Sequence, residues 1–525
     1  MDPTCCLDLP DLVLVDSGQG WQPAGGTGDE RGAGGITARF TRGDGLAIAV
    51  AGAAIRAVRL RWRRPVPDCQ VLGDAWERGY GDLEWRGLVA DRAMPWYALI
   101  HDGACLHGIG VATGGAAFAA WFIDAGGITL ELDLRCGGQP VRPGDRAIAA
   151  ATVMVRSGVP GEDEHVAAHA FCRALCPAPR LPATPVFGGN DWYYAYGKQT
   201  ADGICRDAAR LAGWSAGLRH RPWCVIDAGW EAGAAPGIIG GGRFDPVPAF
   251  GDMATLARRI DGLGCSPGLW LRPLLAPADV DARLVLRRTA DGPSYDPSLP
   301  EAIADVQQRV RTAAGWGYGL LKHDFTTFDI FGRWGFQMGG SVAADGWAFA
   351  DPTRTSAEIV RGLYATIREA AGGALVLGCN TVGHLAAGLT EIQRTGDDTS
   401  GRFWERTRKM GPNTLAMRMP QHGAFFAADA DCVGLTGVIP WPLNRAWLEA
   451  LAASGTALFV SAHPDAVGPE QDAALRAAFA LADSAPAPSA ALDWRSGTAP
   501  RRWRTAQGER NWQWDDEGAP AVCPP

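Results

Sequence analysis

Residues 301–324, EAIADVQQRVRTAAGWGYGLLKHD, contain the repeating unit that decides the fold. Apolar side chains recur at helical spacing over Glu301–Ala314, and Leu320–Asp324 is a short apolar run that ends in charged residues. The first pattern is typical of an amphipathic helix, and the second is typical of a buried strand. This stretch therefore predicts a helix followed by a strand, as in an α/β fold.

The same alternation continues on both sides of this stretch, from about residue 184 to residue 485. Further helical periods cover Met253–Leu263 and Ala357–Ala371. The strand-like runs are Val186–Asn190, Trp223–Ile226, Pro267–Leu271, Leu320–Asp324, Leu375–Cys379, Glu391–Arg394, Val433–Thr436 and Ala457–Ser461. Eight βα units in about 300 residues match the size and order of a (β/α)8 TIM barrel. A doubly wound sheet, which would have fewer units, is the second interpretation.

The segments that flank the predicted barrel have a different pattern. In residues 1–160, runs such as Ile128–Cys136 alternate apolar and polar side chains between glycine-rich breaks, which predicts an antiparallel β-sandwich. His165–Cys176 follows as a short helix, so residues 161–183 are expected to form a linker helix. Residues 486–525 carry several tryptophans among charges and predict a short C-terminal β segment. The predicted chain is thus multidomain, with the barrel at 184–485.

Composition excludes several classes of protein. The 525 residues are 47% apolar and 20% charged, which indicates a globular rather than a disordered chain. The net charge is −8, and the longest basic cluster alternates with apolar residues, as on the outer face of a strand. Nucleic acid is therefore not an expected partner.

Membrane, metal and secretion signals are also missing from the sequence. No apolar run approaches the ~20 residues of a membrane helix, and the start lacks the pattern of a secretion signal, so we expect a cytoplasmic protein that does not bind membranes. The thirteen cysteines lack paired CxxC spacing, so neither a disulfide framework nor a metal site is expected. A homo-oligomer is left open.

Because TIM-barrel sites lie at the carboxyl ends of the strands, the polar and aromatic residues at those ends are the candidate site residues. In chain order these residues are Asp191, Trp192, Asp227, Trp230, Trp270, Arg272, Lys322, Asp324, Cys379, Asn380, Arg394, Asp397 and Asp398. Tryptophan is abundant, at 21 residues against 8 Tyr and 17 Phe. Flat aromatic faces beside fixed carboxylates suit sugar rings, although large tryptophans could equally fill the seam between the barrel and the sandwich.

Asp324 and Asp398 are the best pair of acids. They are 74 residues apart, about two βα units, so they would project into one cavity from the fourth and sixth strands. A nucleophile and a proton donor facing one cavity are the minimum apparatus of retaining glycoside hydrolysis. Lys322 would keep Asp324 ionised, whereas Asp398 would need a site that raises its pKa. Taken singly, either acid could instead cap a helix.

The residues around these acids resemble a known family. The matching segments are Val225–Trp230 (VIDAGW), Asp296–Ser298 (DPS), Trp316–Phe325 (WGYGLLKHDF), Leu377–Asn380 (LGCN) and Arg394–Asp398 (RTGDD). Their order resembles family 36 glycoside hydrolases, the alpha-galactosidases, over roughly residues 184–470. The resemblance implies that Asp324 is the nucleophile, that Asp398 is the general acid/base, and that no metal or organic cofactor is needed. It also implies that Asp227, Trp230, Lys322 and Arg394 line the subsite for the terminal sugar of an oligosaccharide.

Two departures from the family pattern bear on specificity. Similar enzymes have two adjacent acids after the second strand, where this chain has Asp227 followed by Ala228. The third strand ends in Arg272 before a proline, where many relatives have an acid. With one sugar contact missing, an α-N-acetylgalactosaminidase or a β-L-arabinopyranosidase remains open beside an α-galactosidase.

Two further hypotheses concern the use of the site. A transglycosylase of the raffinose- or stachyose-synthase type would use the same two acids, and a catalytically retired sugar-binding protein would need neither. Leu72–Arg86 is dense in aromatic and charged residues, so it either folds over the site and narrows it, which favours short substrates, or forms a solvent-facing hairpin. In the first case, replacing Trp76 with Ala should change the Michaelis constant.

Overall fold

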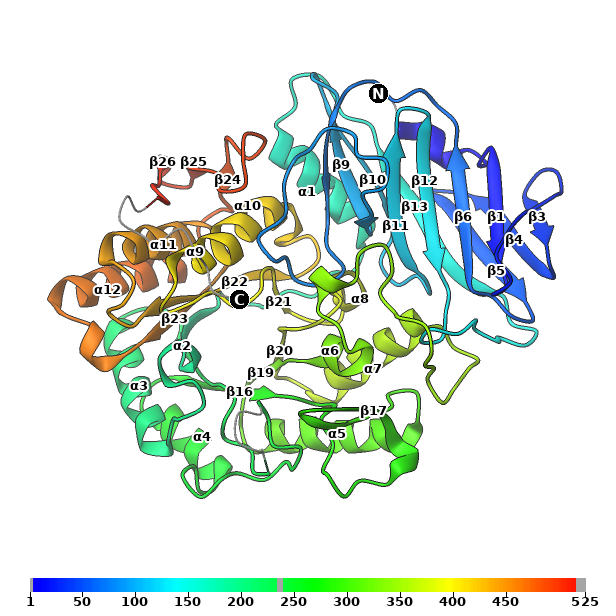
Figure 1. Ribbon diagram of the computed structural model, residues 1–525. Coiled ribbons are helices and arrows are strands. Elements are labelled where there is room, and N and C mark those ends of the chain that lie inside the picture. The colour runs from blue at the N-terminus through cyan, green and yellow to red at the C-terminus, as the bar shows by residue number, and fades with distance from the viewer. Residues whose placement is uncertain (1–2, 234–238, 516–525) are drawn as a thin grey trace.

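The structure is a computed structural model that describes residues 3–233 and 239–515. Two antiparallel sheets come first, a closed parallel barrel follows, and a small antiparallel sheet ends the described chain (Figure 1). The predicted fold class, a β-sandwich before a (β/α)8 barrel with C-terminal strands, is confirmed. Among the described residues, no helix combines the length and apolar character needed to cross a bilayer.

The first domain is a β-sandwich of two sheets. In spatial order one sheet contains β2 (Trp21–Pro23), β1 (Leu12–Asp16), β6 (Ala57–Trp62), β12 (Gly127–Asp133), β11 (Phe118–Asp124) and β8 (Met94–Pro95). The other contains β3 (Glu30–Ala33), β4 (Ile36–Arg42), β5 (Leu46–Gly52), β13 (Ile148–Arg156), β10 (Leu106–Val111), β9 (Tyr97–His101) and β7 (Gln70–Gly73).

The alternation of side chains along β12 shows how the sequence sets the two faces of this sheet. Ile128, Leu130 and Leu132 are buried, whereas the polar residues between them are half-buried on the other face. On that outer face Glu131 forms an ion pair with Arg59 of β6 at 2.7 Å. Arg59 and Arg61, the two arginines of the basic cluster that lie in β6, are therefore on the outer face of a strand, as the alternation predicted.

The barrel is closed by eight parallel strands in chain order. They are β14 (Phe187–Asn190), β15 (Trp223–Ile226), β16 (Ser266–Leu271), β19 (Leu320–His323), β20 (Leu375–Gly378), β21 (Ile392–Arg394), β22 (Ala427–Leu435) and β23 (Ala457–Ala462). The helices are α1 (Glu164–Leu175), α2 (Trp192–Ala195), α3 (Ala201–Trp214), α4 (Met253–Gly262), α5 (Pro300–Gly315), α6 (Thr326–Phe331), α7 (Ser356–Ala370), α8 (Gly383–Ala386), α9 (Trp404–Arg408), α10 (Thr414–Arg418), α11 (Trp441–Ala453) and α12 (Pro469–Asp483).

Local sequence explains where the main barrel helices begin. In α5 a proline occupies the first turn, where its missing N–H has no partner to lose, and Ala302, Val306 and Val310 form the buried stripe. At α7, the Thr355 hydroxyl accepts from the Glu358 backbone N–H while the Glu358 carboxylate accepts from the Thr355 N–H, a capping box.

The seventh barrel strand differs from its prediction. The sequence predicts Val433–Thr436, but β22 begins six residues earlier, at Ala427. Its first half contains Asp429 and Asp431, which do not resemble strand residues, and the ladder with β23 has a bulge between Asp429 and Cys432. Asp431 has φ 70°, so the bulge turns its carboxylate out of the strand pattern.

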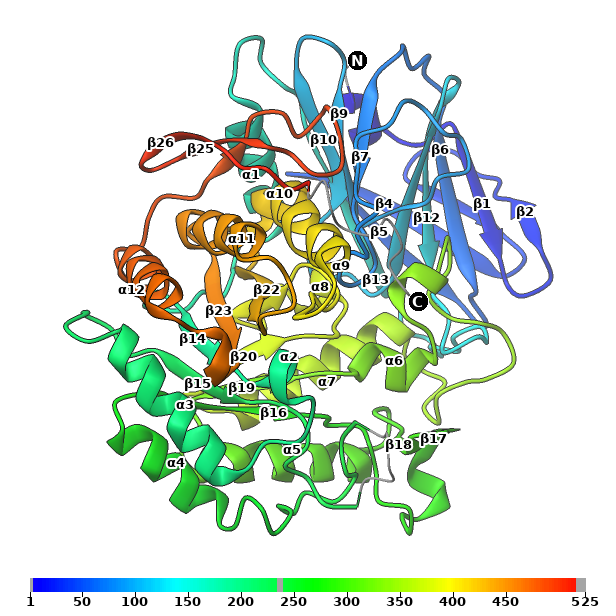
Figure 2. The ribbon, with the colours of Figure 1, turned by 60° about the vertical axis from the view of Figure 1, so that its left-hand side comes forward.

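Two small sheets complete the fold. After β16, β17 (Val285–Thr289) and β18 (Gly292–Tyr295) form a hairpin. At the C-terminus, β24 (Ala490–Ala491), β25 (Arg502–Thr505) and β26 (Gly508–Asn511) form a separate sheet, drawn in red beside α1 in Figure 2. Trp494 Nε1 of this segment donates to the Glu164 carboxylate of α1 at 2.9 Å, and Trp514 stacks on Trp404 of α9. The segment thus bridges the linker helix and the barrel.

Arg272, the unexpected residue after β16, is buried and ties the barrel to α6. Its side chain has no exposed surface, and its guanidinium binds both carboxylate oxygens of Asp329, at 2.6 Å and 3.1 Å. It also pairs with Asp291 at 2.9 Å and lies 4.1 Å from the centre of the Phe325 ring. Arg272 is therefore a structural residue that anchors the loops around the barrel mouth.

Replacing Arg272 with Met is expected to lower the free energy of unfolding of the barrel by about 3–5 kcal/mol, because the buried Asp329 carboxylate would lose its cation. Arg283→Met is the matched control, since Arg283 pairs with Asp281 at 2.8 Å on the surface, where its side chain is 75% exposed. That control should change the free energy by less than about 1 kcal/mol. Urea unfolding followed by tryptophan fluorescence measures both, and equal effects would show that the Arg272 pair is not buried in solution.

Candidate functional site

A cavity of about 320 Å³ opens at the carboxyl ends of the barrel strands. Its walls combine acids, cations and aromatic rings from the barrel with two residues of the sandwich. The lining residues are Arg78, Tyr80, Trp192, Asp227, Ile239, Trp270, Lys322, Asp324, Phe325, Trp334, Phe336, Asp397, Asp398 and Arg406. Seven of the predicted site residues thus come together here, namely Trp192, Asp227, Trp270, Lys322, Asp324, Asp397 and Asp398.

Asp324 lies at the end of β19 in a fixed orientation. Its Oδ1 accepts from the Phe325 backbone N–H at 2.7 Å, and its Oδ2 accepts from Trp270 Nε1 at 3.2 Å. Phe325 has φ 63°, a conformation that bulky residues rarely adopt and that clusters at functional sites. This turn places the Phe325 ring against the cavity and directs its N–H toward the Asp324 carboxylate.

Asp227 and Lys322 form a buried ion pair on the cavity wall. Lys322 Nζ lies 2.7 Å from Asp227 Oδ2, which also accepts from Asn190 Nδ2 at 2.6 Å. The sequence predicts Lys322 as the partner of Asp324, but its hydrogen bond goes to Asp227 across the barrel. The pair presents an ammonium and a carboxylate side by side, which matches the donor and acceptor needs of neighbouring sugar hydroxyls.

Asp398 is surrounded by positive charge. Its Oδ1 lies 2.9 Å from Arg394 Nη2 and 3.6 Å from Arg78 Nη1, while 37% of its side chain is exposed. Burial would raise the pKa of Asp398, but Arg394, Arg78, Lys322 and Arg406 outweigh it and lower that pKa to about 2. The ligand-free site therefore does not supply the raised pKa that Asp398 would need as a proton donor, because the nearby cations outweigh burial.

A loop and a helix that the sequence did not indicate complete the cavity walls. Trp334 and Phe336 come from the loop after α6, where the Trp334 ring stacks on Phe328 at 4.5 Å and 60% of Phe336 is exposed. Arg406 of α9 pairs with Asp397 at 2.7 Å. The only sequence signal for these residues is that aromatic and charged side chains lie close to predicted strand ends.

The segment Leu72–Arg86, called here the sandwich segment, folds over the site rather than into solvent. Gly79 forms a parallel bridge with Gly396, in which Gly79 N donates to Thr395 O and Asp397 N donates to Gly79 O, both at 2.8 Å. Arg78 and Tyr80 line the cavity on either side of this bridge. Trp76 does not, because it is buried in the domain seam with its Nε1 donating to Gly339 O at 2.8 Å.

The remaining candidates at the strand ends are buried behind the cavity wall. Trp230 has no exposed surface, and its Nε1 donates to Trp270 O at 2.9 Å. Asn380 is also fully buried, and its Nδ2 donates to the Glu77 carboxylate of the sandwich segment. These two side chains support the wall rather than form it. The residues found behind the wall are Asp191, Trp230, Cys379, Asn380 and Arg394.

Arg394 supports the wall through four partners, one of which is the Tyr193 hydroxyl at 3.4 Å from its Nη2. It pairs with Asp431 at 2.6 Å and with Asp398 at 2.9 Å, and its Nη1 donates to Cys379 Sγ at 3.3 Å. Only 1% of its side chain is exposed, so the guanidinium acts on the cavity through Asp398. Cys379 is fully buried, and its Sγ also accepts from Nη1 of the cavity-lining Arg78 at 3.8 Å.

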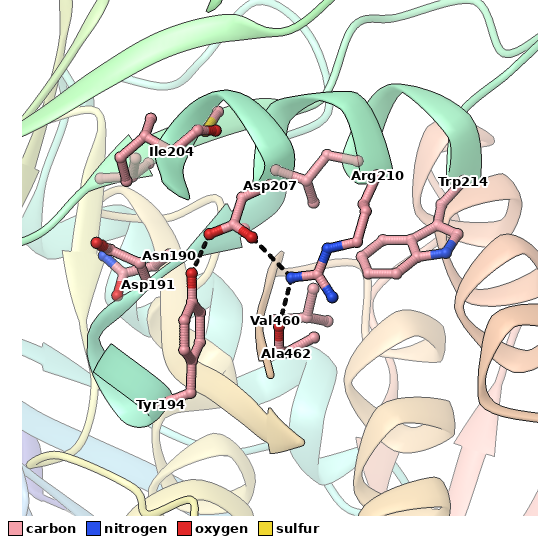
Figure 3. A pocket seen from close by; sticks show the side chains of 13 residues that line it. Asn190, Asp191, Tyr194, Ile204, Asp207, Arg210, Trp214, Val460 and Ala462 are labelled. Carbon is pink, nitrogen blue, oxygen red and sulfur yellow. Dashed lines mark hydrogen bonds and ion pairs between the residues drawn. The ribbon is translucent and has the colours of Figure 1, made fainter. Parts of the chain in front are cut away.

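Asp191 lines a second, much smaller cavity of about 20 Å³ between β14 and α3 (Figure 3). Its Oδ1 accepts from the Asp227 backbone N–H at 2.8 Å, and its Oδ2 has no hydrogen-bond partner among the described residues. Burial and the nearby Asp227 carboxylate raise the pKa of Asp191 well above its usual value. Asp191 therefore positions the Asp227 loop from behind.

The chemistry of the main cavity follows from its residues. Two carboxylates, Asp324 and Asp398, face one space, and the Asp227–Lys322 pair stands beside them. Aromatic rings supply flat apolar faces between these charges. Within the described ranges, no group of three or more His, Cys, Asp or Glu side chains could hold a metal ion. The arrangement can bind a neutral polyhydroxylated ring and offers it both a nucleophile and a proton carrier.

Comparisons with known proteins agree with this architecture. No protein-family model matches the chain, and no curated protein matches it. An alpha-galactosidase from Thermus thermophilus, solved with p-nitrophenyl alpha-D-galactopyranoside, aligns with a TM-score of 0.63 and 20% identity over 91% of this chain and 96% of that one. A GH36 alpha-galactosidase from Geobacillus stearothermophilus, solved with 1-deoxygalactonojirimycin, aligns with a TM-score of 0.56 and 14% identity over 87% and 68%. At these identities, the likeness shows a shared fold.

Proposed function

We propose that this chain is a retaining, exo-acting α-glycosidase of glycoside hydrolase family 36, which removes a terminal galactose-like residue from a neutral oligosaccharide. One observation carries the proposal: Asp324 and Asp398 line one cavity at the carboxyl ends of the barrel strands. Their surroundings differ, because N–H donors hold Asp324 while guanidinium groups face Asp398. The ligands of two structural neighbours, p-nitrophenyl alpha-D-galactopyranoside and 1-deoxygalactonojirimycin, support the same substrate class.

In the first step, the Asp324 carboxylate attacks the anomeric carbon of the terminal sugar. The glycosidic C–O bond breaks, and its oxygen takes a proton from Asp398, which leaves a covalent glycosyl-enzyme. In the second step, Asp398 takes a proton from a water molecule, and the resulting hydroxide displaces Asp324 with the original configuration restored. The Asp227–Lys322 pair binds hydroxyls of the sugar in both steps.

The first step requires Asp398 to be protonated. In the ligand-free site the nearby cations hold Asp398 as a carboxylate, whereas proton donation requires the acid. A bound sugar would cover the exposed 37% of this side chain, and the loss of water favours the neutral acid. Substrate binding therefore moves the pKa of Asp398 upward, in the direction that donation needs.

Proton NMR of wild-type protein with an aryl α-galactoside tests this function. Galactose should appear first as the α-anomer, because two displacements retain the configuration. Asp324→Asn serves as the control that separates enzyme turnover from a contaminant. The β-anomer as first product would contradict the retaining mechanism.

The same assay with other substrates resolves the specificity that Ala228 leaves open. An α-N-acetylgalactosaminide and a β-L-arabinopyranoside should be compared with the galactoside by kcat/KM. Adding a sugar acceptor distinguishes hydrolysis from transglycosylation, because the transferase forms a new disaccharide in place of free sugar. Binding without turnover of every substrate would instead indicate a sugar-binding protein.

A further inference from the structure

The sandwich segment is built into the barrel mouth by several independent contacts. The Gly79–Gly396 bridge joins its backbone to the loop that follows β21. Asp74 pairs with the buried Arg418 of α10 at 2.8 Å, and the Glu77 carboxylate accepts from Gly335 N at 2.7 Å. The segment is thus a fixed wall of the cavity, and the side chain between these anchors has a defined position.

Arg78 is the side chain at that position, and its guanidinium faces the acidic pair. Nη2 lies 2.8 Å from Asp397 Oδ1, and Nη1 lies 3.6 Å from Asp398 Oδ1. Only 6% of the side chain is exposed, and its guanidinium carbon lies 5.4 Å from the centre of the Trp334 ring. Because Arg78 and Asp397 are largely shielded from water, the charge of Arg78 acts on Asp397 with little screening, and it acts on the partly exposed Asp398 with more.

We propose that Arg78 is a positioning residue for Asp398, which fixes the Asp397–Asp398 pair against the cavity wall and sets the pH range in which Asp398 carries its proton. The inference rests on the proposed function, because it concerns the acid that this function requires. It assigns part of the site to the sandwich, although the two acids belong to the barrel. A barrel without this segment would contain both acids but lack their shared cation.

The other charged groups around Asp398 do not replace Arg78 in this role. Arg394 from β21 also binds the buried Asp431, and Arg406 from α9 pairs with Asp397. Lys322 from β19 is engaged by Asp227. Further titratable groups around this carboxylate are Tyr193, Tyr196, Asp397 and Asp431. Arg78 is therefore the cation that contacts both members of the acidic pair from outside the barrel.

The test is the pH dependence of kcat for Arg78→Met with an aryl α-glycoside, because kcat reports the pKa of Asp398 in the substrate complex. Asp398 must be protonated to donate, so activity falls as pH rises through its pKa. Loss of a cation within about 4 Å should raise that pKa, and the alkaline limb of the profile should move up by about one pH unit or more. Arg78→Lys keeps the charge, and its alkaline limb should stay close to that of the wild type.

Tyr80→Phe is the matched control, because Tyr80 lines the cavity from the same segment and carries no charge. Its rate can change, but its alkaline limb should not move. A folded Arg78→Met variant with the wild-type limb would overturn the inference. Circular dichroism and the thermal unfolding midpoint establish that each variant is folded.

A second measurement does not depend on activity. Carbon-13 NMR of protein labelled at the Asp carboxyl carbons follows the titration of Asp398 directly, with Asp398→Asn identifying its signal. The signal should titrate at higher pH in Arg78→Met than in the wild type. An unchanged titration overturns the inference even if no glycoside is turned over, whereas a shifted titration in an inactive protein supports it and contradicts only the proposed function.

Discussion

Asp324→Asn is expected to lower kcat by about 10⁴-fold or more, because an amide cannot form the glycosyl-enzyme. The substitution preserves the volume of the side chain but not its hydrogen bonds. Both Asp324 oxygens accept, one from Phe325 N–H and the other from Trp270 Nε1–H. Whichever way the amide turns, its NH₂ group faces one of these donors, so the variant loses one hydrogen bond as well as the nucleophile.

Trp270→Phe separates these two effects. It removes the Nε1 donor and leaves the Asp324 carboxylate in place, so kcat/KM should fall by only about tenfold, the usual value of one hydrogen bond. Steady-state kinetics with an aryl α-galactoside measure both variants. In Asp324→Gly, azide should enter the vacated space and yield a glycosyl azide of inverted configuration. If Asp324→Asn stays within about tenfold of the wild type, Asp324 is not the nucleophile.

Asp398→Asn should have an effect that depends on the leaving group. With an oligosaccharide substrate, the leaving group is a sugar alkoxide, which is a poor leaving group and needs the proton of Asp398. The kcat/KM for this substrate should therefore fall by about 10²–10⁴-fold. Dinitrophenolate is a good leaving group that needs no proton, so the first step with a dinitrophenyl glycoside should continue. A burst of dinitrophenol should then precede slow turnover. Azide should accelerate that turnover and give a product of retained configuration, because no general base is needed.

Asp397→Asn is the matched control for this prediction. Asp397 lies next to Asp398 and pairs with Arg78 and Arg406 at 2.8 Å and 2.7 Å. Its loss should disturb the site without producing a dependence on the leaving group. Stopped-flow absorbance with a series of aryl glycosides distinguishes the two variants. Equal losses for every leaving group in Asp398→Asn would show that this residue is not the proton donor.

The barrel could be predicted because its strands are short, apolar and bounded by clear breaks. Trp223–Ile226, for example, has the same limits in the structure as in the prediction. The start of β22 could not be found, since Asp429 and Asp431 resemble a loop until their partners are known. Asp431 is paired with Arg394, which reaches it from the neighbouring strand.

The site was predictable only as far as the strand ends determine it. Asp227, Asp324 and Asp398 follow strands of one barrel, so their convergence follows from the fold. Which of the strand-end residues face the cavity does not follow from the fold, because a turn after a strand can rotate a side chain toward the cavity or away from it. Trp230, for example, lies behind Trp270. Arg78 is far from Asp398 in the chain, and no pattern in the sequence indicates that the two meet.

The backbone bridge between Gly79 and Gly396 has a consequence for how the protein is assembled. The sandwich precedes the barrel in the chain and is therefore synthesised first. Its residues Arg78 and Tyr80 cannot line the cavity until the barrel has folded beside them. During refolding, the glycosidase activity should therefore return later than the secondary structure of the barrel. For modular engineering, the sandwich and the barrel should be exchanged as one unit, because Arg78 and Tyr80 of the sandwich line the same cavity as the barrel residues.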